Sequence, residues 1–371
     1  MGYSVDNRLD LSIYFGDTEF PISNSNTVDA LIVECMIGTI LPTFFLKVTD
    51  AIDILQTRSL VRDGQRVTIV VKGPGELKPR MMSFRIFKSK NQTTQMGSTW
   101  MIDGYFDRPR YWLQTHNSGS RDTSAGLVRF ITDICDIQCI SRGTADEQLW
   151  LPQNRTWGEW LRSVAVSGYA SDKSLMLQGI DLNGVMRYLD FNDKVPPKAT
   201  LVYGRYEDGQ IPIMDYAPST QSGLTNRITG YNSVMRSQPT TRKEKAYNEL
   251  AFSPDSRDPL LSPDLKAEGK RGYQQYGPID FGNTHDAAER AFYQNKRYAN
   301  LYNLSVEFMT NVVSGLTLFD TINFIPKSGA KENDNSYGGQ YKISAYQMRI
   351  EAMTYTEFIC GERHGLNNPK W

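Results

Sequence analysis

Two cysteines in this 371-residue chain have a spacing that could serve metal binding. Cys135 and Cys139 lie four residues apart, so both would face the same side of a helix. A tetrahedral zinc site needs two further ligands, and His116 is the one histidine in that region. Buried cysteines that pack as small apolar groups are the favoured interpretation. We therefore predict no metal site and no cofactor.

Two pairs of carboxylates are candidates for glycoside hydrolysis, which uses two carboxyl groups about 5–9 Å apart. Asp133 and Asp136 fall on a predicted helix, whereas Asp190 and Asp193 fall at the end of a predicted strand. No aromatic substrate cleft can be traced to either pair, so solvated surface charge is the favoured interpretation. A polysaccharide hydrolase that uses Asp133 and Asp136 stays open as an alternative.

Nucleophilic and phosphate-binding motifs are missing from the sequence. His116, His285 and His364 are far apart, no G-x-S-x-G motif is present, and Cys360 falls at the end of a predicted strand. The glycines of Gly73-Pro74-Gly75 follow a strand, but neither a helix nor Lys-Ser/Thr comes next, so this segment is predicted to be a turn. We predict no catalytic residue and no enzymatic activity.

The bulk composition excludes several functional classes. Lys+Arg and Asp+Glu both total 41, and this balance argues against a strongly basic nucleic-acid surface. The most apolar early stretch, residues 30–48, is interrupted by polar residues and proline and is not a membrane span. The N-terminus lacks the layout of a signal peptide, and the four scattered cysteines give no disulfide framework.

The elements that would position these residues are mostly strands. Residues 304–360 twice carry long runs of alternating apolar and polar residues, which is typical of half-buried antiparallel sheet. Short alternating segments separated by turn residues fill the first hundred residues and indicate a sandwich or small barrel. The sequence therefore predicts a sheet-rich unit at each end of the chain.

The middle of the chain carries two helical patterns. Leu127, Ile131, Ile134 and Gln138 share one helical face. In the second pattern Thr156 and Glu159 form a T-x-x-E capping box, and Gly168 is placed to end the helix. Trp157 and Trp160 follow at helical spacing with Leu161 and Val164, so core packing is favoured over sugar or nucleobase binding.

A polar, proline-rich arm at residues 237–283 is the candidate contact region. Aromatic side chains in such a setting favour protein–protein contact over a core, with surface disorder as the alternative. Tyr337, in a polar loop at residues 327–340, is a further candidate. The predicted partner or subunit contacts are Tyr247, Phe252, Tyr273, Tyr276, Phe281 and Tyr337.

The succession of motifs in the middle and last parts of the chain resembles the baseplate hub of contractile-tailed bacteriophages of the T-even type. In that family a capped helix is followed by an S-D-K-type turn and a strand–turn–strand that carries D-x-x-G-V. The matching segments are residues 151–152, 156–161, 171–174, 178–181 and 184–186, then 294–299, 303–308, 316–325 and 341–359. The likeness covers about half of the chain, and the arm at residues 237–283 departs from it.

The resemblance implies an α+β fold with two tail-tube-like antiparallel β-barrel domains, an intervening α+β domain and an irregular insertion. The first barrel would span residues 1–110 and the middle domain residues 111–197. The second barrel would span residues 198–236 and 295–371. The insertion, ending in a helix, would span residues 237–294.

The function implied by the resemblance is structural. Three copies would form a pseudo-sixfold homotrimeric ring that joins the tail tube, or a tube-initiator protein, to a central spike protein among other baseplate proteins. DNA would pass through the lumen without sequence recognition and the chain would not enter a membrane. The protein would assemble in the host cytoplasm and reside in the virion tail. A tail-associated cell-wall polysaccharide hydrolase and the hub-like part of a type VI secretion spike remain as alternatives.

Overall fold

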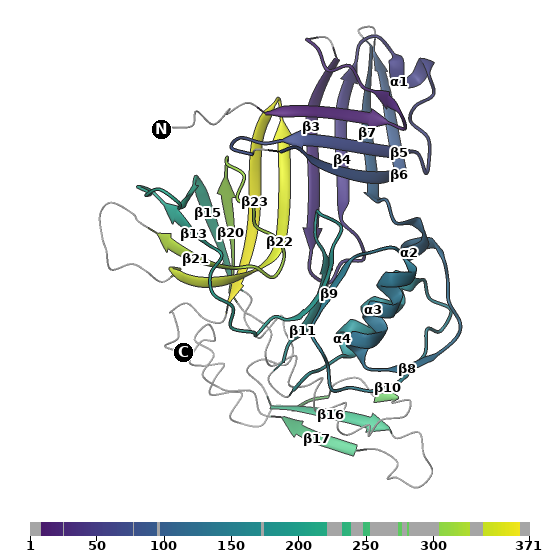
Figure 1. The fold of residues 1–371 in the computed structure, drawn as a ribbon, viewed down its shortest axis with the longest axis vertical. Coiled ribbons are helices and arrows are strands. Elements are labelled where there is room, and N and C mark those ends of the chain that lie inside the picture. The colour runs from purple at the N-terminus through teal and green to yellow at the C-terminus, as the bar shows by residue number, and fades with distance from the viewer. Residues whose placement is uncertain are drawn as a thin grey trace.

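The computed structural model shows a chain that is mostly β, with few helices and a curled, half-barrel sheet (Figure 1). It describes residues 9–220 except 25, 77, 95–96 and 172–173, and then residues 232–238, 248–252, 274–276, 280–281, 304–326 and 337–363. The central sheet has 14 strands.

The first part of the chain supplies half of this sheet. Its strands are β1 (Asp10–Phe15), β2 (Thr18–Glu19), β3 (Asn26–Met36), β4 (Thr43–Asp50), β5 (Arg66–Lys72), β6 (Arg80–Thr94) and β7 (Gly97–Phe106), with the short helix α1 (Ile54–Thr57) between β4 and β5. Apolar side chains alternate along them, as in β4, where every second residue is buried. The predicted strands of this region are confirmed.

The last part of the chain supplies the other half. Its strands are β13 (Ala199–Tyr203), β14 (Ile211–Ile213), β15 (Asp215–Thr220), β20 (Leu304–Thr310), β21 (Thr321–Pro326), β22 (Gly339–Glu351) and β23 (Thr354–Arg363). The alternating pattern of residues 304–310 and 339–363 is confirmed as strand. Leu316 and Leu318, which also alternate, are buried but lie in the segment before β21, so the expected strand at residues 316–325 begins only at Thr321.

The two halves join edge to edge. β22 pairs antiparallel with β3, from Ala345 opposite Met36 to Glu351 opposite Ala30, and Figure 1 shows these two strands side by side. The resemblance implies two tail-tube-like β-barrel domains; in the structure the strands of both halves belong to one continuous sheet that curls through both. A strand can take a partner on each edge, and β22 uses its spare edge to bind the other half.

Both halves follow the same order of strand pairing. In the first half the order is β3-β4-β7-β6-β5-β1, and in the second it is β15-β20-β23-β22-β21-β13. All these neighbouring pairs are antiparallel except β13 with β21, which is parallel, whereas β1 with β5 is antiparallel. By position in this order β3 corresponds to β15, β4 to β20, β6 to β22 and β7 to β23.

Local irregularities fall at corresponding places in the two halves. The register of β6 against β7 shifts between Ile86 and Lys88, and that of β22 against β23 shifts between Ile343 and Ala345. The residue opposite each bulge is a glycine, Gly104 in β7 and Gly361 in β23. A Cβ atom would lie 2.2 Å from the Phe44 ring at Gly104 and 2.9 Å from the Tyr341 Cβ at Gly361. Neither position has room for a larger residue.

Between the halves lies a middle segment that carries the other helices of the described chain. It contains α2 (Pro109–Leu113), β8 (Ser120–Asp122), α3 (Ser124–Ile134), β9 (Cys139–Ser141), β10 (Gln148–Trp150), α4 (Trp157–Ser167), β11 (Met176–Ile180) and β12 (Met186–Asp190). The predicted capping box of α4 is confirmed, with Thr156 and Glu159 bonded reciprocally and Gly168 at the C-cap. Gln138 lies beyond the end of α3, so its place on that helical face was wrong.

Four short strands of residues 232–281 pair among themselves in a separate sheet. They are β16 (Asn232–Gln238), β17 (Asn248–Phe252), β18 (Gln274–Tyr276) and β19 (Asp280–Phe281). The expectation of an irregular arm is therefore wrong for these residues. The helix expected after residue 284 lies outside the described residues.

Candidate functional site

The cysteines predicted to be inert are held in the interior. Cys135 is buried at the C-cap of α3 and Cys139 is partly buried in β9. Burial raises the pKa of the Cys135 thiol to about 12, against an opposing effect of Arg110. A thiol with so high a pKa is a poor nucleophile and a poor metal ligand at neutral pH. Within the described ranges no group of three or more His, Cys, Asp or Glu side chains is placed to hold a metal ion.

The two carboxylate pairs do not face a common cleft. Asp133 and Asp136 are both exposed, at the end of α3 and just beyond it. Asp190 is buried and accepts hydrogen bonds from the backbone N–H groups of Leu175 (2.8 Å) and Asn192 (3.0 Å). Arg142 forms an ion pair with Asp193 beside it. The second pair therefore serves a structural role at the end of β12.

The aromatic cluster of the middle segment is core, as predicted. Trp157 and Trp160 are 4% and 1% exposed, and the His116 ring stacks on Trp157 with centroids 4.1 Å apart. A stacked histidine in this position has an apolar packing role. His285 and His364 lie outside the described residues.

The predicted contact aromatics fall in different places. Phe252, Tyr276 and Phe281 belong to β17, β18 and β19, each paired with β16, while Tyr247 and Tyr273 lie outside the described residues. Tyr337 is half-buried before β22, and its carbonyl accepts a 2.6 Å hydrogen bond from the Tyr341 hydroxyl. The structure thus brings three of them to one small sheet and keeps Tyr337 with the large one.

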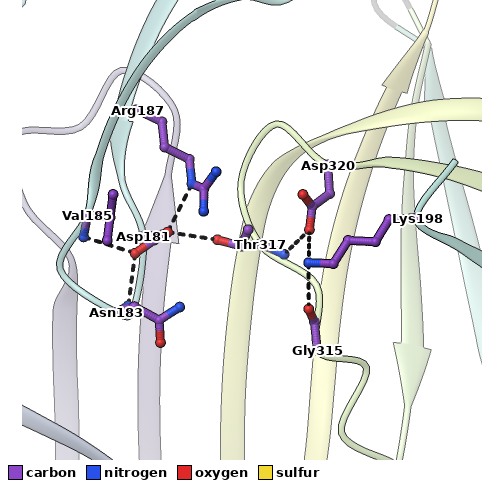
Figure 2. Close-up of polar contacts among 8 residues, drawn as sticks. All are labelled: Asp181, Asn183, Val185, Arg187, Lys198, Gly315, Thr317 and Asp320. Atoms are coloured by element: carbon purple, nitrogen blue, oxygen red, sulfur yellow. Dashed lines mark hydrogen bonds and ion pairs between the residues drawn. The ribbon is translucent and has the colours of Figure 1, made fainter. Parts of the chain in front are cut away.

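A buried carboxylate joins the middle segment to the second half of the sheet (Figure 2). Asp181, in the turn between β11 and β12, is fully buried. Its Oδ1 accepts from the backbone N–H groups of Asn183 (2.9 Å) and Val185 (3.0 Å), and its Oδ2 accepts from Arg187 Nε (2.9 Å). Oδ2 also accepts from the Thr317 hydroxyl at 3.1 Å, which belongs to the segment between β20 and β21. Four donors compensate one buried charge.

Thr317 connects this carboxylate with a second one. While its hydroxyl donates to Asp181, its backbone N–H donates to Asp320 Oδ2 at 2.9 Å (Figure 2). Lys198, at the start of the second half, donates to the same Asp320 oxygen at 2.7 Å and to the Gly315 carbonyl at 2.9 Å. These contacts fix the loop of residues 310–320 against the middle segment.

A second polar cluster lies between the two halves of the sheet. Arg80 of β6 donates to the Tyr355 hydroxyl at 2.7 Å, and that hydroxyl donates to Glu357 at 2.5 Å. Burial, and then the neighbouring Glu357, raise the pKa of Tyr355, so its hydroxyl stays a donor at neutral pH. Glu357 is fully buried and also accepts from the backbone N–H of Ser314. The cluster ties β6 to β23.

The turn at Gly73-Pro74-Gly75 packs into the same junction. The Gly73 N–H donates to the Glu76 carboxylate at 2.7 Å, which confirms the turn. A Cβ at Gly73 would lie 2.5 Å from the Val313 side chain and 3.2 Å from the Tyr355 ring. Glycine is therefore required here for close packing of the two halves, and not for phosphate binding.

A groove of about 410 Å³ lies between α4 and the turn after β3. Ile40, Tyr105, Trp112 and Arg162 line it, and Glu159 is the single carboxylate among its lining residues. That carboxylate is engaged in the cap of α4, accepting from the Thr156 N–H at 3.0 Å. The groove therefore lacks the carboxylate pair that glycoside hydrolysis uses.

No helix in the described part of the chain is long and apolar enough to cross a membrane. No protein-family model and no curated protein matches the sequence. Solved structures do match. The tail protein of Neisseria meningitidis MC58 aligns with a TM-score of 0.63 at 9% identity, over 97% of this chain and 98% of that one. The 43 kDa tail protein of prophage MuSo2 from Shewanella oneidensis aligns with a TM-score of 0.61 at 12% identity, over 96% and 98%.

This chain has the fold of these two tail proteins. A chain of the Francisella PdpA–VgrG complex is also similar, with a TM-score of 0.50 at 8% identity, over 98% of this chain and 54% of that one. At identities this low, the likeness between this chain and the three proteins is one of fold. The sequence motifs that suggested a phage tail fold were short, and the whole-length structural likeness supports the same fold without them.

Proposed function

We propose that this chain is a structural protein of a bacteriophage tail, the hub of its baseplate. Three copies form a pseudo-sixfold ring, each contributing the two matching halves of its sheet. The ring joins the sixfold tail tube to the threefold central spike and surrounds the DNA channel. The observation that supports this proposal best is the whole-length likeness to two tail proteins.

The polar clusters agree with a structural role. Asp181 and Glu357 are fully buried carboxylates. Asp181 accepts a hydrogen bond from Thr317 in another part of the chain, and Glu357 accepts from Tyr355, whose hydroxyl accepts from Arg80 of the first half. Such clusters hold the two halves of the sheet and the middle segment in one arrangement. A ring component needs this rigidity, because small changes in the angle between its halves would prevent closure.

A second assignment, the hub-like part of a type VI secretion spike, is supported by the likeness to the Francisella PdpA–VgrG chain. The two assignments share the ring and differ in the particle. Co-purification with tail-tube and sheath proteins of a phage would favour the baseplate. Co-purification with a secretion-system tube and toxin would favour the alternative.

The oligomeric state tests the ring directly. Native mass spectrometry of the purified full chain should give a species at three times the 42.1 kDa chain mass, and electron microscopy should show a ring with a central opening. A protein that stays monomeric and binds neither tube nor spike components would contradict the proposal.

A further inference from the structure

The correspondence between β6 and β22 exposes one difference between the two halves. Each strand pairs along its first part with a neighbour in its own half, β6 with β5 and β22 with β21. Each then passes its bulge. Beyond the bulge, residues 345–351 of β22 pair with β3, whereas the corresponding residues 88–94 of β6 have a strand on one edge only, β7, within the described part of the chain. β6 thus carries a vacant copy of the edge that β22 uses.

Exposure agrees with this vacancy. Along residues 345–350 of β22 every second residue is buried. Along residues 87–93 of β6 all residues are exposed except the half-buried Asn91. An exposed strand edge of this length presents unpaired N–H and C=O groups, which proteins usually cover or pair.

The complementary edge is at the other end of the sheet. β15 corresponds to β3, and among the described strands it pairs with β20 alone. Its residues Asp215, Ala217, Pro218 and Ser219 are exposed. In one chain, β22 of the second half holds β3 of the first half. The corresponding contact would be β6 of a first half holding β15 of a second half.

We propose that residues 89–94 of β6 pair antiparallel with β15 of a second copy of this chain. This inference rests on the ring proposed above and names the surfaces that close it. β15 and β6 stand at opposite ends of the path β15-β20-β23-β22-β3-β4-β7-β6, so seven interstrand steps of about 4.8 Å, roughly 34 Å in all, separate them along the sheet. The contact joins two different surfaces, and repeated contacts of this kind close a ring when the rotation allows.

The internal seam also fixes the register. The bulges align Ala345 with Lys88, Arg349 with Gln92 and Gly361 with Gly104. Gly104 leads through β4 to Val33, and Gly361 leads through β20 to Pro218, so Pro218 aligns with Val33 and Ala217 with Ile32. Arg349 stands opposite Ile32 in the internal seam. In the seam between two copies Gln92 therefore stands opposite Ala217 of the neighbouring copy.

The same alignment puts Lys90 opposite Ser219 and Asn91 opposite Pro218. Val33 occupies the place of Pro218 in the internal seam, opposite Met348. Proline has no N–H, and on an edge strand its nitrogen faces outward. The seam between copies therefore has one donor fewer than the internal seam. It is the weaker of the two, which suits a contact that forms only on assembly.

Disulfide trapping tests the pairing. We expect the double variant Gln92→Cys/Ala217→Cys to form covalent oligomers up to a closed trimer under mild oxidation, because opposite residues in an antiparallel pair have Cα atoms about 4.5–5.5 Å apart. Each single variant should stay monomeric on a denaturing gel. The matched control is Lys88→Cys/Asp215→Cys, on the same two strands. Its cysteines would be six residues out of register, about 20 Å apart, and should not cross-link.

The outcomes separate this inference from the ring itself. A native trimer whose Gln92→Cys/Ala217→Cys variant does not cross-link overturns the strand pairing and leaves the hub proposal standing. A ladder that runs beyond three copies supports the pairing and overturns the trimer. A monomer that never cross-links overturns both.

Charged substitutions at the same two positions give an independent test that needs no engineered cysteine. Ala217→Lys alone places a cation in a seam that already holds Lys90, and trimer formation should weaken at least about tenfold. Adding Gln92→Glu opposite it should restore the trimer. Equal loss in both variants would overturn the register.

Discussion

At the scale of single residues, Asp181 is a fully buried carboxylate whose charge must be compensated inside the protein. A fully buried carboxylate is stable only where donors replace its lost hydration. Asp181 has four, one of them the Thr317 hydroxyl from a distant part of the chain. Its Oδ2 also pairs with Arg187, whose side chain is 20% exposed. The residue therefore stabilises both its own turn and the contact with the second half of the sheet.

Replacing this carboxylate should be costly. Asp181→Asn removes the charge that compensates Arg187 and turns one acceptor into a donor that faces other donors. We expect the free energy of unfolding to fall by about 3 kcal/mol, the usual cost of breaking a buried ion pair. Urea denaturation followed by circular dichroism would measure it.

The matched control is Asp136→Asn, at an exposed carboxylate with a φ of 55° that asparagine tolerates. It should change the free energy of unfolding by less than about 0.5 kcal/mol. If Asp181→Asn proved equally mild, the junction would contribute little to stability. On cell-wall zymograms we expect no cleared band from either the native chain or Asp136→Asn. A band that Asp136→Asn abolished would support the alternative hydrolase, which would depend on Asp133 and Asp136.

Glu362 makes stability depend on pH in a defined direction. Burial raises its pKa above the usual 4.5, although a hydrogen bond with Ser344 acts against the shift. Its protonated form is therefore favoured in the folded state. This contribution to stability is present below pH 4.5 and is lost as the pH rises through the raised pKa. Glu362→Gln should remove this loss of stability with rising pH, and so raise the melting temperature at pH 7. Scans between pH 4 and 7 that run parallel for both proteins would contradict it.

At the scale of elements, the capping box of α4 illustrates what short-range sequence can determine. Thr156 accepts from the Glu159 N–H at 3.3 Å, and the Glu159 carboxylate accepts from the Thr156 N–H at 3.0 Å. Thr156→Ala should lower the free energy of unfolding by about 1 kcal/mol. Thr57→Ala, at an exposed residue ending α1, should have little effect in the same denaturation experiment. Equal effects would mean that α4 is held by packing alone.

Elements whose signals are local could be predicted from sequence, and those that depend on distant partners could not. The cap of α4 and the alternation of residues 304–310 and 339–363 involve neighbours along the chain, and both were found. The β22–β3 seam joins residues about 310 positions apart, and nothing in either strand specifies the other. The strands of residues 232–281 are short and partly parallel, so their sequence lacks the turn signals of hairpins. The sequence places Asp181 in a D-x-x-G-V motif but does not predict its hydrogen bond with Thr317, which is 136 residues away.

Pro218 sets the strength of the proposed seam between copies. Restoring the residue type found at the corresponding place in β3, as Pro218→Val, would supply the missing N–H. Each further hydrogen bond is worth about 1 kcal/mol and the closed trimer has three such seams, so the trimer should dissociate at roughly tenfold lower concentration. Mass photometry across a dilution series would measure the change. The freer edge should also raise aggregation. An unchanged dissociation concentration would argue that the Pro218 nitrogen does not face a neighbouring strand.

At the scale of the whole molecule, the two halves of the sheet explain how one chain can present two related surfaces. The same strand order, the bulges in β6 and β22 and the glycines at positions 104 and 361 recur in both halves. The halves differ chiefly in their connections. Six residues, 37–42, join β3 to β4, whereas residues 221–303 join β15 to β20. The second half thus repeats the strand order of the first, with a long insertion in one hairpin and a reversed first strand, β13.

This difference predicts that the insertion can be removed without loss of the ring. The strands of residues 232–281 pair among themselves, and the pairing of β15 with β20 is of the same kind as that of β3 with β4. Replacing residues 221–303 with the six-residue turn of residues 37–42 should therefore leave a single cooperative unfolding transition and a trimer. Because Phe252, Tyr276 and Phe281 would be lost, binding to the tube or spike partner should fall. Native mass spectrometry and pull-down with those partners would measure the two effects separately. Loss of the trimer would show that the insertion, and not only the strand edges, holds the copies together.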